Sequence, residues 1–570
     1  MNIKNIIEKF LSYTPKSDYE FLLEDSIKET YDKSSNCSTE NSKISKIFSS
    51  LNINKEYLKT LYNLSINSDI ILREFSITIN KKSYNSFLIY IDGMIDSKLM
   101  DEFVLQPLMK QSHLNIFDNK RIYSEVITNN ITIRKVRKFN LPNYLLNCLL
   151  PQNTINKIFY FSEVTDAINS GNCVLFIESL DLAFDIEVKG FNQRNVDTPK
   201  NEVVIKGPHE AFVENLRTNT SMIRRIINNE NLIIENLEVG NLTKTKCAIC
   251  YLNNIANSNL VNEVKYRLSN LDIDSLISAG DLEELISDSN ILGVPEILST
   301  ERPDKVSKYL LHGRVAILVN GTPYGLIVPT VLIDFLSSSE DSNLNVRFGN
   351  FLRILRVFAA LITLLLPGLY VAITSFYQEI LPTNLLFSIL ASRENVPFPI
   401  IVEILIMEFS FELIREAGLR VPSPIGPTIG IVGALVLGQA AVSASIVSPI
   451  LIIIVAITGI SSFAIPDFSF GFHLRYFRFF FIILGFMAGF LGIALGLFVY
   501  IATICNLKSF GIYFAIPLAS FNKTKGHSYL LPPIWKRENR ASYIFPKKEK
   551  EQSKISMKWK YKQNSNIKEW

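Results

Sequence analysis

Glutamates recur at one-turn spacing in an apolar stretch near residue 410. On a helix, Glu408, Glu412 and Glu416 fall within about 100° of arc together with Arg415. Like charges at this spacing repel each other, so a cation has to compensate them, and Arg415 covers part of the charge. Repeated around an oligomer, the carboxylates would form an acidic ring at a pore mouth that favours cations. The alternative interpretation is a solvated amphipathic face at the surface of a membrane.

A helix with two unlike faces is predicted after the proline-rich run that ends at Pro427. Small residues gather on one face, and such faces let membrane helices pack closely. The glycines on this packing face are Gly426, Gly430 and Gly433. The opposite face carries Thr428, Val432, Val436, Gln439 and Ser443.

Thr, Gln and Ser side chains rarely share a stripe that faces lipid, so this second face is predicted to line a pore. Val432 and Val436 would form a hydrophobic constriction that closes the pore by dewetting. The alternative is that Gln439 bonds to an adjacent helix and that the stripe is buried packing. The last apolar run has its own glycine face, which predicts helix packing rather than conduction. Its members are Gly485, Gly489, Gly492 and Gly496.

Catalytic and metal-binding patterns are not visible in the sequence. The six cysteines are scattered, and only Cys247 and Cys250 are close, in a predicted strand where they point to opposite faces. The five histidines are dispersed, and His209 and His312 are predicted to be surface or loop residues. There is no P-loop and no G-x-S-x-G motif. We therefore expect no enzyme activity, no metal and no cofactor, and the net charge of +4 does not by itself indicate nucleic acid.

The candidate residues lie in or beside long uncharged runs, which are predicted to form membrane-spanning helices. Residues 357–378, 421–466 and 479–507 carry no charge over 22, 46 and 29 residues, and a membrane helix needs about 20. The middle run is long enough for two helices, with a break at Ser448–Pro449. Residues 380–417 are apolar but charged, which favours a re-entrant or amphipathic segment. Four spans are predicted, at about 354–378, 425–447, 449–466 and 478–505.

Positive charges near the spans set the expected orientation. Arg353 and Arg356 precede the first span, and residues 522–570 carry 13 Lys or Arg against 4 Asp or Glu. Both ends are therefore predicted on the cytoplasmic side, with the basic tail adhering to anionic lipids and not to nucleic acid. No signal peptide is predicted at the start. Arg475 and Arg478 conflict with this topology, which places them on the outer side.

The first 345 residues look like a soluble protein in two subdomains of α/β or α+β class. Alternating residues predict strands at 69–78 and 85–96, a strand pair in 171–190 and a hairpin in 314–328 with a tight turn at Asn320–Gly321. Helical patterns lie at 207–227 and 259–288. The predicted domains are a flexible lead-in (1–55), two soluble subdomains (56–155 and 156–345), a membrane domain (346–521) and a basic tail (522–570).

Several stretches together resemble the A subunits of the nutrient germinant receptors of endospore-forming bacteria, the GerA family. They include YIDGMID (90–96), TERPDKVSKYLLHGRVAILVNGTP (300–323), LLPGLYVAITSFYQEILPT (365–383) and FELIREAGLRVPSPIG (411–426). The resemblance covers about residues 60 to 520. The family usually has Gly-Pro-Arg-Glu-Gly-Phe where this chain has Gly-Pro-His-Glu-Ala-Phe at 207–212, which puts a binding role for that turn in doubt.

The resemblance implies a non-enzymatic, multi-pass protein of the spore inner membrane. It implies a transporter-like B subunit and a lipoprotein C subunit as partners, and self-association, as a pentamer, into the ion-conducting part of the receptor. Nutrient binding would open this part and release monovalent cations. Two alternatives remain open: a secondary transporter, against which the lack of a visible inverted repeat argues, and a non-conducting scaffold.

Overall fold

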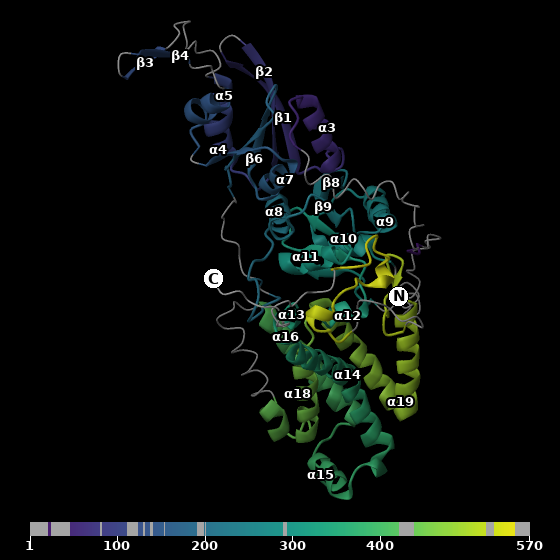
Figure 1. Ribbon diagram of the computed structural model, residues 1–570. Helices are drawn as coiled ribbons and strands as arrows, with labels where there is room; N and C mark the ends of the chain where they lie inside the picture. The colour runs from purple at the N-terminus through teal and green to yellow at the C-terminus, as the bar shows by residue number, and fades with distance from the viewer. Residues whose placement is uncertain are drawn as a thin grey trace, which may run out of the picture.

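The computed structural model arranges the chain in three tiers (Figure 1). It describes residues 21–23, 46–79, 82–110, 123–128, 131–136, 141–152, 154–190, 199, 201–288, 293–420, 438–519 and 529–552. We refer to residues 46–190 as the first unit, 201–335 as the second unit, 346–506 as the helical part and 507–552 as the C-terminal segment.

The first unit is built on a five-stranded antiparallel sheet of order β1-β2-β6-β7-β5. Both faces of β2 are buried in its second half, with Phe87, Ile89 and Ile91 in one core cluster and Leu88 and Tyr90 in another. The strands are β1 (Ile70–Ile79), β2 (Lys82–Ile91), β5 (Ile155–Ile158), β6 (Cys173–Ile177) and β7 (Ala183–Ile186). The helices are α3 (Leu51–Leu61), α4 (Ser97–Met100), η2 (Asp101–Leu105), α5 (Gln106–Lys110), α6 (Leu141–Tyr144), η4 (Leu145–Leu149) and α7 (Phe161–Asn169). A separate hairpin joins β3 (Tyr123–Thr128) to β4 (Ile131–Val136).

The second unit has a second five-stranded antiparallel sheet, of order β10-β12-β11-β9-β8. In β9, Cys247 and Cys250 lie in two different core clusters, so they point to opposite faces as predicted. The strands are β8 (Leu232–Val239), β9 (Thr245–Leu252), β10 (Leu298–Thr300), β11 (Val315–Val319) and β12 (Gly325–Val328). The helices are α8 (Leu216–Ile226), α9 (Ser258–Ser269), α10 (Ala279–Ile286), α11 (Pro303–Leu311) and α12 (Leu332–Phe335).

The division between the two units differs from the predicted boundary at 155. Strands β5, β6 and β7 pair with the first sheet, so that unit continues to about residue 190. It also begins before residue 56, since Ile47 is buried in its core and α3 begins at Leu51. Sequence alternation identifies strands but not their sheet, because partner choice depends on contacts distant in sequence.

Two local predictions in the second unit also need correction. The helix expected over 207–227 begins only at Leu216, because Gly207 has a positive φ of 149° and Asn215 caps the helix through Arg217 and Thr218. The β11–β12 connection spans residues 320–324, with Gly321 at φ 93°, so it is longer than a two-residue turn.

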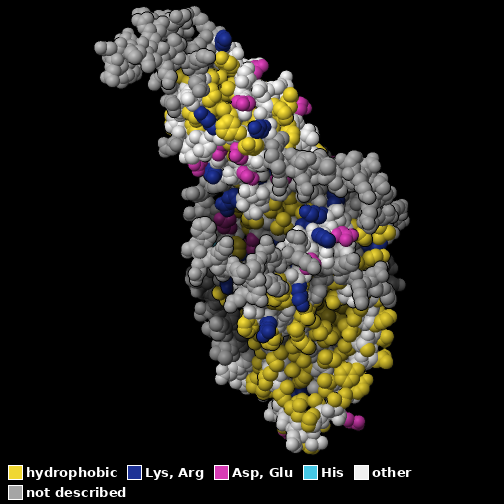
Figure 2. All heavy atoms as spheres, in the orientation of Figure 1, with side chains coloured by type: hydrophobic (Ala, Val, Ile, Leu, Met, Phe, Trp, Pro, Cys, Tyr) yellow, Lys and Arg dark blue, Asp and Glu magenta, His cyan; other side chains and the backbone are white. Residues whose placement is uncertain are grey.

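The helical part forms the lowest tier, and hydrophobic side chains cover most of the face that Figure 2 shows. Two helices, α14 (Val346–Phe376) and α19 (Phe468–Asn506), are long and apolar enough to cross a membrane. Between them lie η5 (Gln378–Ile380), α15 (Thr383–Arg393), α16 (Ile400–Arg420) and α18 (Pro449–Phe463). Ser448 is the N-cap of α18 and Pro449 its first residue, which confirms the predicted break.

Helix α19 is a hairpin of two helices and not one straight span. Ala488 and Gly489 have non-helical dihedral angles, with Gly489 at φ 57° and ψ −137°. His473 Nε2 lies 3.0 Å from Tyr500 Oη, although a straight helix would separate the two residues by about 40 Å. The two halves, 468–488 and 489–506, therefore run antiparallel and side by side, and the predicted single span at 478–505 is wrong.

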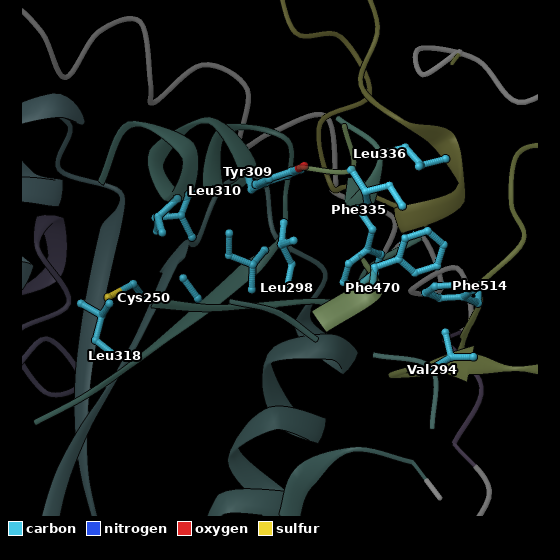
Figure 3. Packing of buried hydrophobic residues seen from close by; sticks show 14 of the residues in the cluster. Cys250, Val294, Leu298, Tyr309, Leu310, Leu318, Phe335, Leu336, Phe470 and Phe514 are labelled. Carbon is cyan, nitrogen blue, oxygen red and sulfur yellow. The ribbon is translucent and has the colours of Figure 1, made fainter. Parts of the chain in front are cut away.

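The start of this hairpin and the C-terminal segment just after it pack on the second unit. The Phe335 ring centroid, on α12, lies 5.9 Å from that of Phe470 and 5.7 Å from that of Phe514 (Figure 3). The hairpin turn lies at the other end of the helical part, where a Cβ added to Gly489 would come within 2.7 Å of Tyr377, just after α14. One hydrophobic cluster thus continues from the second sheet into the helices.

The C-terminal segment returns to the second unit. Strands β13 (Lys508–Ser509) and β14 (Ile512–Tyr513) form a short hairpin, and η6 (Ile534–Lys536) and η7 (Ser542–Ile544) follow. Arg540 is buried and donates from Nε to the Leu311 carbonyl at 2.7 Å, and Asn257 donates to the Phe545 carbonyl at 3.2 Å. Residues 529–552 are therefore packed against protein, whereas a lipid-adhering tail was expected from residue 522 onward.

Candidate functional site

The acidic row of α16 is buried at Glu408 and becomes exposed toward Glu416. Glu408 is fully buried, and its Oε2 lies 2.9 Å from Nη2 of Arg478, which is also fully buried. The same Nη2 donates to Glu412 Oε1 at 3.0 Å. Glu412 is partly buried and Glu416 is exposed. The predicted acidic mouth is thus wrong for Glu408, because a cation from α19 already neutralises it.

Arg478 is the functional candidate that sequence reasoning missed. Its Nε and Nη1 atoms have no hydrogen-bond partner within the described residues, so a buried guanidinium is only partly satisfied. Arg475 also faces this cluster, 3.7 Å from Glu412. The sequence held a signal for this pairing, because the glutamate row of α16 requires a compensating cation. Arg475 and Arg478 were the two cations that did not fit the predicted orientation of the spans.

Arg415 contacts both the acidic row and α18, since its Nη1 lies 3.6 Å from Glu412 Oε1. Its Nη2 donates to Ser462 Oγ at 2.5 Å, and its guanidinium lies 4.1 Å from the ring centroid of Phe463. At the opposite end of α16, Glu403 accepts from Arg393 at 2.8 Å and from the Ser448 backbone N–H at 3.2 Å. Each end of α16 therefore contacts the corresponding end of α18, so the two helices run parallel.

The predicted pore stripe is only partly within the described chain. Thr428, Val432 and Val436 lie outside the described residues, as do Gly426, Gly430 and Gly433. Gln439 and Ser443 lie on a described helical stretch, and both are exposed. The structure thus leaves two polar side chains of the stripe uncovered on the apolar tier.

The later glycines lie at close helix contacts. A Cβ on Gly485 would come 2.6 Å from the Gly368 carbonyl of α14, so the two helices touch through their backbones. Added Cβ atoms on Gly492 and Gly496 would clash with Leu484 across the hairpin. Gly489 instead forms the turn, where its positive φ suits a residue without a Cβ.

A cavity of about 340 Å³ lies between the first and second units. Its lining includes Gly93 and Asp96 from the loop after β2, Gly190 from the segment after β7, and Arg217 and Arg225 from α8. Arg217 also pairs with Asp92 across the units, and Arg224 binds Asp69 through two buried hydrogen bonds of 2.8 and 2.9 Å. Stretches far apart in sequence therefore meet at one polar cavity.

Other candidate chemistry is not assembled in the described residues. No group of three or more His, Cys, Asp or Glu side chains there could hold a metal ion. Burial raises the pKa of the Cys250 thiol to about 12, so this thiol is not activated. His209 is exposed in a loop, and His312 caps the end of α11.

The fold defines a mixed α/β protein of two units, followed by a helical part with two helices apolar and long enough to cross a membrane. The family model described as Bacillus/Clostridium GerA spore germination protein matches residues 56–543, and the chain belongs to this GerA family. The family resemblance seen in the sequence motifs is thereby confirmed.

Relatives of known sequence cover most of the chain. It is 38% identical over 491 residues to spore germination protein KA of Bacillus subtilis, covering 86% of each chain. It is 34% identical over 482 residues to the uncharacterized membrane protein YfkQ of the same species, covering 84% of this chain and 89% of the relative. The crystal structure of the N-terminal domain of the A subunit of the Bacillus megaterium spore germinant receptor GerK3 matches 51% of this chain and 98% of its own, with 28% identity and a TM-score of 0.38.

Proposed function

We propose that this chain is the oligomeric, cation-conducting A subunit of a nutrient germinant receptor in the spore inner membrane. Family membership supports the role in germination, since relatives carry the names of spore germination proteins. As in the expectation from the motifs, a transporter-like B subunit would sense the nutrient and a lipoprotein C subunit would complete the receptor. The chain would associate with copies of itself, as a pentamer.

The observation that carries the conducting role is the exposure of Gln439 and Ser443 on the apolar tier. Exposed polar side chains in a lipid environment are unfavourable, so they are expected to face water or other protein. In an oligomer they would face a central pore, with Val432 and Val436 along the same stripe. The alternative, packing against a neighbouring subunit, covers the same residues without conduction.

The proposed topology differs from the four predicted spans in its described helices. The crossing segments among the described residues are α14, α16, α18 and the two halves of α19, and α16 and α18 run in the same direction. The first half of α19 begins beside α12 of the second unit, and the chain after the second half returns to α12. Both the α/β units and the C-terminal segment then lie on the core side of the membrane.

This topology removes the conflict at Arg475 and Arg478. They lie in the first half of α19, which begins beside α12, and they face the carboxylates of α16. Because their charge is neutralised within the protein, they do not act as unpaired positive charges on the outer side. The Arg478–Glu408 contact would hold α16 against α19 in the closed state.

Recordings from the purified full-length chain in planar bilayers test this proposal. Channel currents with a reversal potential that follows the gradient of monovalent cations are expected. A saturable solute flux without channel currents would instead indicate a secondary transporter. The absence of both currents and solute flux would indicate a scaffold. The transporter outcome and the scaffold outcome would each contradict ion conduction by this chain.

A second candidate function is ligand sensing by this chain itself. The polar cavity of about 340 Å³ between the two units is large enough for a small nutrient molecule. Binding there would change how the units meet, near Arg217 and Asp92. Titration of germinants into the full-length chain tests this sensing role. The Arg225→Gln variant should bind a germinant more weakly than the exposed control Lys246→Gln. Equal binding by both variants would contradict a ligand site in this cavity.

A further inference from the structure

A smaller cavity, of about 60 Å³, lies where α11, the start of α14 and the C-terminal segment meet. A single water needs about 10–15 Å³ by the same measure, so the space suits a few waters or one small polyatomic ion. Its charged lining comes from all three elements. The members used below are Lys308, Arg353, Arg537, Asp334 and Glu551.

Most of the charges around this cavity are already paired. Asp334 accepts from Arg314 at 2.6 Å, and Arg353 donates from Nε to Asp341 at 3.0 Å. Lys308 and Arg537 make no ion pair within the described residues, and Arg537 uses only its Nε, toward the Pro532 carbonyl at 2.9 Å. Glu551 is the remaining carboxylate of the lining. Two cations therefore face one carboxylate in a confined space.

Lys308 experiences this excess of positive charge. Burial, followed by the neighbouring Arg353 and Arg537, lowers the pKa of Lys308 to about 8 despite the smaller opposing effects of Asp341 and Asp304. Burial likewise raises the pKa of Glu551, which weakens it as a counter-charge. A negatively charged ligand in the cavity would relieve the repulsion between the cations.

We propose that this cavity binds a phosphate-class oxyanion. The Lys308 ammonium supplies a compact charge, and the Nη atoms of Arg537 supply a planar pair of donors suited to phosphate oxygens. Ser337, Ser338 and Ser339 line the same space and add hydroxyl groups. Donors arriving from three elements suit a tetrahedral anion, which has oxygens pointing in several directions.

The bound anion would connect the second unit, helix α14 and the C-terminal segment. Lys308 lies on α11 of the second unit, Arg353 on α14, and Arg537 on the C-terminal segment. Arg353 lies four residues before the uncharged run of α14, so the cavity is near the level of lipid headgroups. The anion therefore has two possible sources, a free phosphate or the headgroup of an anionic lipid.

Calorimetric titration of the full-length chain in neutral detergent tests the site. Inorganic phosphate should bind the wild type, while equal ionic strength of chloride should not reproduce the heat. Lys308→Gln and Arg537→Gln should each weaken binding by about tenfold or more, and Lys308→Arg should retain it. Lys246→Gln, an exposed lysine of β9, is the matched control and should bind like the wild type.

Vesicles distinguish the two sources of the anion. The chain is reconstituted in phosphatidylcholine alone or with phosphatidylglycerol, and its thermal midpoint is compared between wild type and Lys308→Gln. A Lys308-dependent increase with phosphatidylglycerol, without binding of free phosphate, assigns the site to a lipid headgroup. Binding of free phosphate assigns it to a soluble anion. Equal behaviour of Lys308→Gln and Lys246→Gln in both experiments would overturn the proposal.

Discussion

Arg478 illustrates how one buried charge organises the helical part. It lies between Glu408 and Glu412, and all three charges would be costly alone in an apolar environment. Replacing both members of a buried pair by neutral residues often costs little, whereas removing one leaves the other unpaired. The Arg478–Glu408 pair therefore specifies how α16 packs against α19 and is expected to add little to the free energy of unfolding.

The first prediction concerns this pair. Arg478→Gln leaves Glu408 buried without a cation, so it should lower the free energy of unfolding by about 3–5 kcal/mol. The double variant Glu408→Gln/Arg478→Gln should recover most of this loss. Thermal or denaturant unfolding of the purified protein in detergent measures both, with exposed Arg347→Gln as control. A double variant as unstable as the single one would contradict the pairing.

The second prediction concerns the pH dependence that Lys308 contributes. Its pKa in the folded protein is about 8, below the ordinary value of 10.5, so the unfolded chain binds more protons between these pH values. Its contribution to stability should therefore rise with pH from about 8 to 10.5. In buffer without phosphate, Lys308→Gln should be more stable than the wild type near pH 7 and lose this slope. An unchanged slope would show that Lys308 is not in this environment.

At the scale of elements, the hairpin in α19 is the largest difference between the predicted and the observed helical part. Its two halves, of 21 and 18 residues, are each about 27–32 Å long, close to the thickness of a bilayer core. Hydropathy could not reveal the turn, because both halves and the turn itself are apolar. Gly489 was assigned to a packing face, and only its backbone angles distinguish a turn from a packing position.

Cross-linking gives a third prediction, for the hairpin itself. In a cysteine-free background, His473→Cys/Tyr500→Cys should react with a short bismaleimide, since the native side chains meet at 3.0 Å. Phe472→Cys/Val499→Cys has the same sequence separation, but both native side chains are exposed, so it should react less. A straight helix would separate each pair by about 40 Å, and neither would react.

The turn residue gives a fourth prediction. Gly489→Ala should destabilise the chain by about 1 kcal/mol or more, because alanine disfavours this positive φ and its Cβ would meet Tyr377. Gly418→Ala, in α16, is the matched control, since an added Cβ there meets nothing within 4 Å. In detergent, Gly418→Ala should leave the free energy of unfolding unchanged or raise it. Equal losses for both variants would argue against the turn.

Across the whole molecule, the sequence predicted element types better than their partners. The strands β1, β2, β6, β7, β9, β11 and β12, the break at Ser448–Pro449 and the opposite orientations of Cys247 and Cys250 follow from local patterns, whereas β3, β4, β5, β8 and β10 were not predicted. The boundary near residue 190 and the Arg478–Glu408 pair depend on contacts between distant segments. Charge counting was least reliable where charges are buried in pairs, because hydropathy scales treat every charge as solvated.

The second unit and the helical part share one hydrophobic cluster. Phe335 of the second unit contacts Phe470, at the start of the α19 hairpin, and Phe514, in the C-terminal segment that follows the hairpin. A shift of the second unit would therefore move both halves of the hairpin at once. Because α19 contacts α16 through Arg478, such a shift would also move α16, next to the proposed pore stripe.

Thiol modification of the proposed pore tests the central claim most directly. In a cysteine-free background, Gln439→Cys should carry cation currents in bilayers that a water-soluble, charged thiol reagent reduces sharply. Ile460→Cys, on the exposed apolar surface of α18, should carry currents that the reagent leaves unchanged. Absence of currents from the reconstituted chain, or equal sensitivity of the two variants, would contradict a pore lined by the Gln439 stripe.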